Sequence, residues 1–413
     1  MVRVVVTGMG AVTPIGNNVN DIWQSIKDNR HGIGRATKVN PEDYKTTLAA
    51  EVKNFDPEHV ISRKDAKRMD LFAQYAVVAA NEAIDMSGFT VTEENAYDVG
   101  VIVGTGSGGY LAMEDNVRKL HDRGPNKVEA LFHIKTPVNM AAASIAMHLG
   151  IKGDSMAVSS ACASGTHSIG EAFLKIKSEQ LTACLAGGAE ATLNDSSYSG
   201  FSVLKAMSTE SDPDRASRPF DKERDGFVPG EGAGILMLES LESAEARGAK
   251  IYAEIVGYGA TTDAYHVTAP RPDGHATGTA MKKAIKMANI SAADISYINA
   301  HGTSTPANDL SETKAIKFAL GEAAYNVAIS STKSYVGHMY GASGGAEAVV
   351  TVQSLMHDFI HPTLNLRNHD PECDLDYVPL TGRTQMIQYA LSNSMGFGGH
   401  NGCLLYTSDA ADE

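Results

Sequence analysis

The sequence predicts an α/β protein built from buried sheets and covering helices, and three observations support this class. Short strand-like runs at residues 4–6, 99–103 and 157–159 alternate with stretches of helical periodicity, which is the pattern of layered sheets and helices. The composition, with 43% hydrophobic residues, 20% charged residues and 39 glycines, is typical of a compact enzyme. Two pairs of distant segments also resemble each other, which predicts two similar halves.

The internal similarity involves one pair of strand-like segments and one pair of strand-to-helix segments. VVVTGMGAVTP (4–14) resembles AEIVGYGATTD (253–263), and DSMAVSSACASGTHSIGEA (154–172) resembles YNVAISSTKSYVGHMYGASGGAEA (325–348). We place the boundary near residue 250, with an N-terminal half at 1–250 and a C-terminal half at 251–413. The two pairs are spaced unequally, so we expect an insertion of loops over about 190–235.

The clearest helix covers residues 70–87. It is rich in alanine and carries apolar residues at helical spacing. Gly88 follows it directly, and glycine commonly ends helices because it adopts the left-handed conformation without strain. We therefore expect a buried helix that ends at Gly88.

Charge and cysteine content exclude several function classes. The 413-residue chain carries a net charge of −14, which argues against general affinity for nucleic acid or an anionic membrane. The four cysteines show no CxxC spacing, so we expect a reducing compartment and no structural zinc site. The start MVRVVVTGMG enters a strand directly, and no apolar run is long enough to span a bilayer. We therefore expect a cytoplasmic protein without membrane contact.

Cys162 lies in the segment AVSSACASGTHSIGEAF (157–173), where a strand-like run gives way to a helix. A buried cysteine is often an inert small hydrophobic residue. The start of a helix, however, offers unpaired N–H groups and the positive end of the helix dipole, which lower the pKa of a thiol. Position alone leaves both interpretations open.

Three further segments place reactive side chains at predicted strand ends. They are NAHGTSTPANDLSE (299–312), SSTKSYVGHMYGASGGAE (330–347) and SNSMGFGGHN (392–401). His301 and His338 each follow an apolar run beside a glycine, which lets backbone and ligand approach closely. Lys333 and Glu347 flank the second histidine. His167, inside the predicted helix of the cysteine segment, is expected to point elsewhere.

Two glycine-rich runs have competing interpretations. GFGG (396–399) is either a plain turn or a bend that aims backbone N–H groups at a developing oxyanion. GTGSGG (104–109) formally matches a dinucleotide fingerprint. No strand ending in an acidic residue follows about 20 residues later, where a ribose-binding carboxylate is expected. A nucleotide site is therefore disfavoured.

Taken together, SSACASGTHSIGEA, NAHGTSTPANDLSE, KSYVGHMYGASGG and NSMGFGGHN resemble the β-ketoacyl-acyl carrier protein synthases, the condensing enzymes of fatty acid synthesis. The motifs occur in the family's order, and the similarity runs from VVVTGMGAVTPIGN to about residue 402. RPFDKERDGFV and the chain length are most similar to the synthase II branch. The resemblance implies a thiolase-like fold, with duplicated halves in αβαβα layers.

The resemblance also implies a role for each motif residue. Cys162 is the nucleophile that accepts an acyl group. His301 and His338 donate hydrogen bonds to the malonyl-derived enolate, and Lys333 matches the active-site lysine. The backbone N–H of Phe397, the gate residue, completes an oxyanion hole with that of Cys162. The implied supporting carboxylates and phosphopantetheine-tunnel threonines are Glu312, Glu347, Thr268, Thr303 and Thr305.

The implied reaction is a decarboxylative Claisen condensation of malonyl-acyl carrier protein with the enzyme-bound acyl group. It needs no metal or organic cofactor, because phosphopantetheine arrives on the acyl carrier protein. The chain is expected to form a homodimer. Some family members hold a structural monovalent cation, and the residues that match its site are Asn299, Glu347, Ser392 and Asn393.

A cluster of cations offers a local exception to the negative net charge. Such a run is often only a solvated helix face. The resemblance favours docking of the acidic carrier protein instead. The residues that match the docking surface are Arg63, Lys64, Lys67 and Arg68, at one predicted helix start, together with Lys127 and Lys205.

Three features depart from the family pattern. Ser107 stands where synthase II relatives often carry a bulky aliphatic residue that limits the acyl pocket, so we expect a deeper tunnel. Asn308 replaces a frequent glycine. The end CLLYTSDAADE begins like a last strand and continues as an acidic tail, to which we assign no role.

Three alternative functions share parts of this pattern. A thiolase shares the fold but requires a second catalytic cysteine in the last glycine-rich motif, where this chain has Phe397 and His400. A non-catalytic subunit resembling a chain-length factor lacks the nucleophile, so Cys162 argues against it. A discrete polyketide ketosynthase stays open, although the absence of a fused acyltransferase favours fatty acid synthesis.

Overall fold

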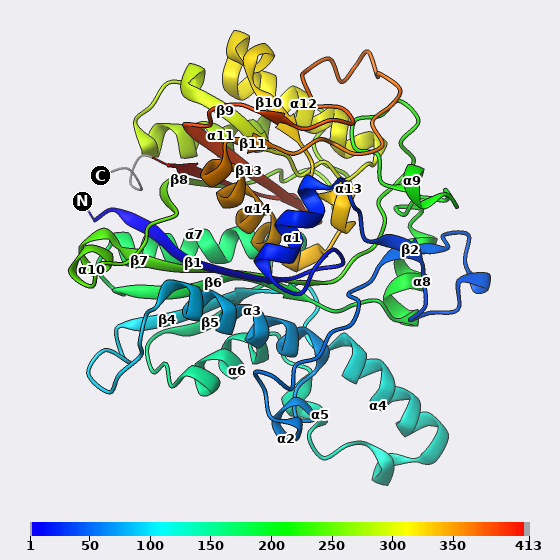
Figure 1. Ribbon diagram of the computed structural model, residues 1–413. Coiled ribbons are helices and arrows are strands. Elements are labelled where there is room, and N and C mark those ends of the chain that lie inside the picture. Colours follow the sequence, from blue (N-terminus) through cyan, green and yellow to red (C-terminus); the bar gives the residue numbers. More distant parts are fainter. Residues whose placement is uncertain (1, 409–413) are drawn as a thin grey trace.

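The computed structural model describes residues 2–408 (Figure 1). A sheet of ten strands forms the centre of this described part. In spatial order its strands are β10 (Ala328–Ser330), β9 (Ile295–Asn299), β13 (Tyr389–Gly396), β14 (His400–Thr407), β8 (Ala253–Thr262), β1 (Val4–Val12), β7 (Gly232–Ser240), β6 (Ala183–Glu190), β4 (Val99–Gly104) and β5 (Ser155–Val158).

The two halves of this sheet repeat each other. At the centre β1 pairs antiparallel with β8. Outward from there, one half reads β1, β7, β6, β4, β5 and the other reads β8, β14, β13, β9, β10. Each half contributes five strands to this sheet. If the five are numbered along the chain, both halves place them in the spatial order first, fifth, fourth, second and third. The predicted duplication is thus confirmed, whereas the boundary at residue 250 stays a prediction.

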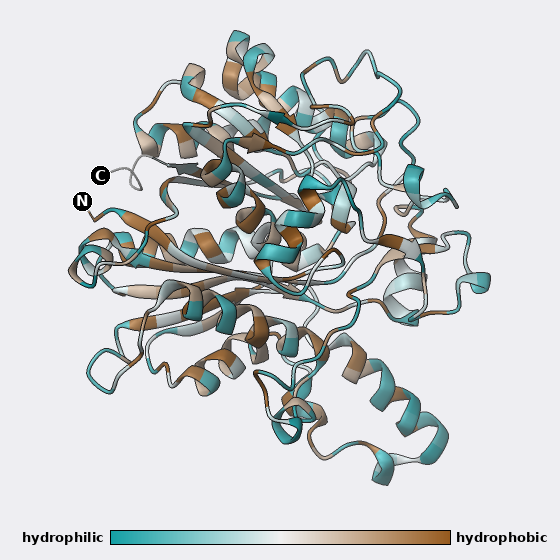
Figure 2. Cartoon of the chain, in the orientation of Figure 1, coloured by the Kyte–Doolittle hydropathy of each residue, from teal (hydrophilic) through white to brown (hydrophobic). Residues whose placement is uncertain are grey.

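Helices cover the sheet in alternating layers (Figure 1). One outer layer contains α3 (Leu71–Ser87) and α6 (Met140–Leu149), and the other contains α11 (His275–Ala288) and α12 (Pro306–Leu320). Between the two sheet halves lie α7 (Ser164–Lys177) and α14 (Ser343–His357). The layers read αβαβα, as predicted. Hydrophobic residues are frequent in the inner layers, and hydrophilic residues are frequent on the outer helices and loops (Figure 2).

The predicted helix over 70–87 is confirmed as α3. The side chain of Asp70 accepts a hydrogen bond from the backbone N–H of Phe72 and so caps its first turn. Gly88 ends the helix with a φ of 63°, the left-handed conformation that glycine adopts without strain. The alanines of α3 are buried against β1 and β7, which explains why this helix contains so few polar residues.

Small residues bring the two middle helices close together. A Cβ atom at Gly165 of α7 would lie 2.8 Å from the backbone nitrogen of Gly345 in α14. A Cβ atom at Gly345 would lie 2.2 Å from the carbonyl oxygen of Gly234 in β7. Larger side chains at either glycine would push the helices apart. Because Cys162 precedes α7 and His338 precedes α14, this packing also brings those two residues together.

The segment from about 190 to 235 is not made of loops alone, so that expectation is wrong. It contains α8 (Asp195–Val203) and the single turn α9 (Pro213–Ala216). Asn194 and Asp212 cap these helices by accepting hydrogen bonds from Ser197 and Asp214. The short capping signals were present in the sequence, but the serine- and glycine-rich interior of α8 masked its helical periodicity.

The remaining elements are short or peripheral. They are α1 (Val19–Lys27), β2 (Ile33–Arg35), β3 (Leu48–Ala50), α2 (Arg63–Ala66), α4 (Tyr110–Arg123), α5 (Phe132–Lys135), α10 (Leu241–Ala246), α13 (Lys333–Val336), β11 (Phe359–Ile360) and β12 (Arg383–Thr384). No helix within residues 2–408 is both long and apolar enough to cross a membrane. The acidic tail at 409–413 lies outside the described residues.

Candidate active site

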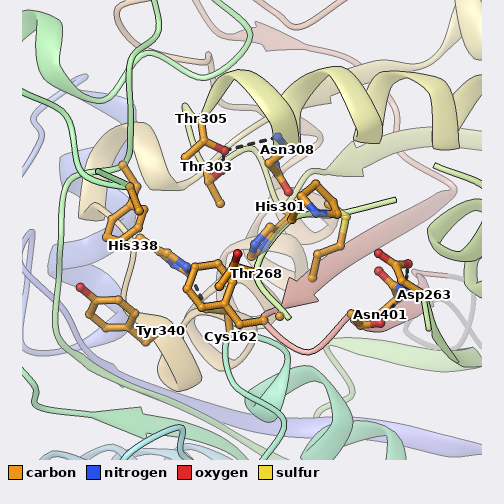
Figure 3. Close-up of a pocket in the computed structure, with 18 of the residues that line it drawn as sticks. Cys162, Asp263, Thr268, His301, Thr303, Thr305, Asn308, His338, Tyr340 and Asn401 are labelled. Carbon is orange, nitrogen blue, oxygen red and sulfur yellow. Dashed lines mark hydrogen bonds between the residues drawn. The ribbon is translucent and has the colours of Figure 1, made fainter. Parts of the chain in front are cut away.

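The reactive side chains singled out in the sequence meet in one pocket (Figure 3). The strands β9, β10 and β13 are parallel neighbours, so their carboxyl ends open toward the same edge of the sheet, where α/β proteins commonly bind ligands. The residues that line the pocket include Cys162 after β5, His301 after β9, His338 after β10 and Phe397 after β13. The sequence-based grouping of these four residues is therefore reflected in space.

Cys162 lies in a sharp loop two residues before α7. Ala161 has a φ of 51°, and Cys162 is only 9% exposed. Its Sγ atom lies 3.1 Å from Nε2 of His338. Burial raises the pKa of the thiol to about 12, while the charge of Lys333 and the backbone N–H of Phe397 oppose this rise. The lowering effect that a helix start exerts on a thiol pKa is therefore outweighed here by desolvation.

The backbone holds the ring of His338 against the thiol. The N–H of His338 donates to the carbonyl of Val228 at 2.7 Å, and its carbonyl accepts from the N–H of Gly230 at 2.8 Å. Its Nδ1 atom lies 3.2 Å from the hydroxyl of Ser343. Burial, assisted by the charge of Lys333, keeps the pKa of His338 well below its ordinary value. The ring is therefore neutral near neutral pH.

Lys333 determines the tautomer of His301. Its Nζ atom lies 3.2 Å from Nδ1 of His301. Because an ammonium group only donates, Nδ1 accepts and Nε2 carries the proton. Burial, followed by the charges of Lys333 and His338, lowers the pKa of His301 well below its ordinary value. The two imidazole rings lie 5.4 Å apart at an interplanar angle of 86°, so two neutral rings face one pocket.

Two buried carboxylates support these residues. Glu347 forms a salt bridge with Lys333, and both side chains are 1% exposed. Glu312 accepts hydrogen bonds from the backbone N–H groups of His301 and Gly302, each at 2.8 Å. Burial raises the pKa of Glu312 to about 7, and the two backbone donors oppose this rise. Glu347 thus compensates the charge of the lysine, whereas Glu312 holds the backbone beside His301.

The GFGG turn folds back over Cys162. A Cβ atom at Gly396 would lie 2.5 Å from the carbonyl oxygen of Ser160. Gly399 has a φ of 80°, which side chains rarely tolerate. This backbone path directs the N–H of Phe397, together with the N–H of Cys162 itself, at the thiol. Two such donors are able to stabilise an oxyanion at the reacting carbon.

Polar residues form one wall of the pocket. The predicted tunnel residues Thr268, Thr303 and Thr305 all line it, as does Asn308. The hydroxyls of Thr303 and Thr305 lie 2.9 Å apart, and Thr305 also caps α12. This wall offers donors and acceptors that are suited to amide groups of a substrate.

Two features of the pocket could not be found from the sequence: an aromatic wall, and a hydrogen bond between two polar side chains, Asn401 and Asp263, which we call the clasp. Phe201, Phe227 and Tyr340 line the pocket from three separate segments. Tyr340 lies within a motif quoted for its histidine, but Phe201 and Phe227 carried no local signal. The clasp joins the side chain of Asn401 to Asp263 at 2.8 Å and ties the GFGG turn to the end of β8. Only the three-dimensional pairing of β8 with β14 brings those two residues together.

Two family models match this chain. The model described as Beta-ketoacyl synthase, N-terminal domain, matches residues 1–244, and the one described as Beta-ketoacyl synthase, C-terminal domain, matches residues 252–367. The chain belongs to the beta-ketoacyl synthase family.

Curated relatives resemble this family member over almost its whole length. The 3-oxoacyl-[acyl-carrier-protein] synthase 2 of Synechocystis sp. (strain ATCC 27184 / PCC 6803 / Kazusa) is 51% identical over 405 residues, which cover 98% of this chain and 97% of that protein. The protein of the same name from Staphylococcus aureus (strain MRSA252) is 48% identical over 405 residues, which cover 98% of each chain. The predicted family assignment is confirmed.

Solved structures agree with the fold. The ketosynthase structure of a type II polyketide system, in complex with its acyl-carrier protein and bound to the hexaketide, matches with a TM-score of 0.90. Its sequence identity is 33%, and the match covers 98% of both chains. A beta-ketoacyl synthase from Burkholderia phymatum STM815 matches with a TM-score of 0.90 at 36% identity and covers 98% of this chain and 99% of that one. The predicted thiolase-like fold is confirmed.

The predicted docking cations all lie on the surface. Arg63 and Lys64 are in α2, a helix of a single turn, and Lys127 ends the 3-10 helix Pro125–Lys127. Lys67, Arg68 and Lys205 lie in turns. The exposed residues of this set are Arg63, Lys64, Lys67, Arg68, Lys127 and Lys205. Their role in docking stays a prediction.

Ser107 does not line the pocket that the described residues form. The backbone N–H groups of Gly106 and Ser107 donate to the carboxylate of Glu190 at 2.7 and 3.1 Å. A protein carboxylate thus occupies the donors that a phosphate would require, which agrees with the rejection of a nucleotide site. A contribution of Ser107 to the acyl tunnel stays a prediction.

His167 has a structural position, as expected. Its Nδ1 atom lies 2.7 Å from the hydroxyl of Ser160, and its Nε2 atom lies 3.2 Å from the carbonyl oxygen of Asn401. The ring therefore connects the loop before Cys162 with the strand that follows the GFGG turn.

Proposed function

We propose that this chain is a 3-oxoacyl-[acyl-carrier-protein] synthase that elongates fatty acids. The observation that carries this proposal is the single pocket that joins the thiol of Cys162, two neutral imidazoles and two backbone donors. Curated relatives at 51% and 48% identity carry the same name. The enzyme is an acyltransferase that needs no metal or organic cofactor for its chemistry, because thioester cleavage and decarboxylation drive the reaction.

The first half reaction transfers an acyl group to Cys162. The thiolate attacks the thioester carbonyl of an acyl-carrier protein, and the N–H groups of Cys162 and Phe397 stabilise the oxyanion. The sulfur–carbon bond to phosphopantetheine then breaks, and the departing thiolate takes up the proton that Cys162 lost. The high pKa of the buried thiol means that this transfer depends on the N–H donors and the charge of Lys333.

The second half reaction uses the paired imidazoles. Malonyl-carrier protein loses CO₂, and the electron pair of the broken bond forms an enolate. Nε2–H of His301 donates to the enolate oxygen, and His338 does the same when the hydroxyl of Ser343 donates to its Nδ1 atom. The enolate carbon attacks the acyl thioester, releases the thiolate of Cys162 and leaves the 3-oxoacyl product on the carrier.

The partner is an acyl carrier protein loaded with an acyl or malonyl group. The ketosynthase of the type II polyketide system, 33% identical, was solved in complex with its acyl-carrier protein. In this chain the predicted docking cations are exposed, and an acidic partner is attracted to such residues even though the net charge is −14. We propose that the reaction takes place in the cytoplasm, together with this carrier protein.

A second copy of the chain covers an exposed apolar face. Six large apolar side chains of α4, α5 and α6 are exposed, and exposed apolar surface of this kind commonly marks a protein interface. They are Tyr110, Met113, Val117, Leu120, Ile134 and Met147, which are between 39% and 70% exposed. These residues support a homodimer.

A monovalent cation has a structural role beside the pocket. Four of the buried side-chain oxygen atoms that lack a hydrogen-bond partner among the described residues belong to the implied cation-site residues, and oxygen ligands suit a hard cation. They are Oδ1 of Asn299, Oε2 of Glu347, Oγ of Ser392 and Oδ1 of Asn393. Asn299 and Ser392 are also cross-strand neighbours in β9 and β13. This set coincides with the residues that the sequence resemblance implied.

The proposed function is tested by incubating the enzyme with acyl-carrier protein and malonyl-carrier protein. Mass spectrometry of the carrier should detect a 3-oxoacyl product that is two carbons longer than the primer. If malonyl-carrier protein is consumed without a longer product, the condensing function is wrong. Repeated extension without reduction of the product would indicate a polyketide ketosynthase instead.

A further inference from the structure

The pocket beside Cys162 has two chemically different walls. Thr303, Thr305 and Asn308 make one wall polar, whereas Phe201 and Tyr340 make the other aromatic. An acyl chain on Cys162 gains the most by burying its methylene groups against the aromatic side, and the amides of phosphopantetheine match the polar side. The extent of the aromatic side therefore limits the length of the acyl group.

Tyr340 closes this aromatic side. It is 6% exposed, although it lines the pocket. Its ring stacks on Phe201 with centroids 4.9 Å apart and an interplanar angle of 17°. It meets the edge of Phe227 at 5.8 Å and the ring of His338 at 5.1 Å. The ring is thus enclosed by aromatic neighbours, and Figure 3 shows it directed away from Cys162.

The backbone leaves Tyr340 little freedom to swing aside. Its φ is 47°, which a residue with a large side chain rarely adopts. His338, two residues earlier in the same loop, is bound through its backbone to Val228 and Gly230. The next residue, Gly341, donates its N–H to the buried carboxylate of Glu190 at 3.0 Å. Movement of Tyr340 would consequently disturb both the catalytic loop and the Glu190 contacts.

We propose that Tyr340 sets the upper limit of acyl length and makes short-chain acyl groups the preferred primers. The proposal rests on the proposed function, since it concerns the acyl group carried by Cys162. Tyr340 and Phe201 occupy the space into which a longer chain would extend. Ser107 is not among the described residues that line this pocket. Its small side chain therefore does not deepen the pocket as these residues form it.

The test compares acyl groups of graded length from acetyl to hexadecanoyl. Acylation of Cys162 is followed by intact mass, and condensation is followed separately by the mass of the carrier product. We expect the wild type to favour butyryl and hexanoyl over dodecanoyl. Tyr340→Leu should raise the ratio of dodecanoyl to butyryl turnover by about ten-fold or more, since even one methylene in an apolar pocket changes kcat/KM by about ten-fold or more.

Three variants make the outcome specific. Tyr340→Phe keeps the ring and should retain the wild-type ratio, whereas Tyr340→Met offers a second opening if the leucine variant does not fold. Tyr44→Leu makes the same chemical change in a neighbouring ring that packs on Tyr198 outside the pocket, and it should leave the ratio unchanged.

Two outcomes would overturn the proposal. One is a wild type that accepts dodecanoyl as readily as butyryl, and the other is an unchanged ratio in folded Tyr340→Leu and Tyr340→Met. If acylation follows the expected length preference but no condensation occurs with any primer, the proposed function fails and the length limit stands. If long chains are both loaded and condensed, the length limit alone fails.

Discussion

The Nε2 atom of His338 lies 3.1 Å from the Sγ atom of Cys162, although the two residues are 176 positions apart in the chain. The glycines of α7 and α14 make this approach possible, because they let the two helices pack without intervening side chains. The thiol is deeply buried, so its reactivity depends on the few charged and polar groups that face it.

Cys162→Ser should abolish acyl loading. Only Cys162 combines a buried thiol with an adjacent imidazole and two N–H donors, whereas Cys184 is enclosed in the strand β6. Intact mass after mixing with acyl-carrier protein should show one adduct on the wild type and none on the variant. Cys184→Ala is the matched control and should load normally. An adduct that persists in Cys162→Ser, on Cys184 or Cys373, contradicts the assignment.

Gly396→Ala should slow acylation by about 100-fold or more, the usual effect of losing one oxyanion donor. The added Cβ would lie 2.5 Å from the carbonyl oxygen of Ser160, so the turn must shift and carry the N–H of Phe397 away from the thiol. The rate is measured by quenched mass spectrometry. Gly34→Ala is the control, because nothing lies within 4 Å of its Cβ position. Equal rates for both variants would refute the role of the turn.

Lys333→Met should move the acid limb of malonyl decarboxylation to higher pH. The charge of Lys333 helps to lower the pKa of both His301 and His338. Without it their pKa values rise toward 6.5, so the neutral rings become protonated at a higher pH, and each Nδ1 atom loses its ability to accept a hydrogen bond. Rates between about pH 5 and pH 8 report this shift. The control Lys53→Met changes an exposed lysine and should give the wild-type pH profile. If the pH profile of Lys333→Met is also unshifted, the charge of Lys333 does not influence the two histidines.

The double variant Lys64→Glu/Lys67→Glu should weaken carrier binding by roughly ten-fold, since two exposed ion pairs contribute up to about 1 kcal/mol each. We expect a higher KM for acyl-carrier protein with little change in kcat, and a loss of the difference at high salt. Lys286→Glu, on the exposed face of α11, reverses a charge elsewhere and should have no such effect. Identical KM values for the double variant and the wild type would remove these lysines from the docking surface.

Strand ends marked by glycine indicated the candidate reactive residues, and the resemblance of the four motifs to a known family grouped them into one pocket. Cys162, His301 and His338 were therefore grouped correctly, as were the layers and the duplicated topology. The sign of the pKa shift of Cys162 was not predicted, because the degree of burial depends on the packing of distant segments. For the same reason Phe201 and Phe227 escaped notice, since neither residue has a local signal.

The position of α8 beside the catalytic loops could not be predicted from the sequence for the same reason. The capping residue Asn194 was visible in the sequence, but nothing local indicated that α8 would carry Phe201 to Tyr340. Likewise, the clasp between Asp263 and Asn401 arises from the antiparallel pairing of β8 with β14. Sequence patterns predict which elements form, whereas contacts between elements depend on register and packing.

The central claim is that Cys162 carries the acyl group while His301 and His338 serve decarboxylation. The most direct test is to mix His301→Ala and His338→Ala separately with acyl-carrier protein and malonyl-carrier protein and to resolve the enzyme and carrier masses over time. We predict that both variants still acquire an acyl adduct on Cys162, whereas malonyl decarboxylation falls by about 100-fold or more. Decarboxylation at the wild-type rate in either variant, or an adduct on another cysteine, would contradict the account.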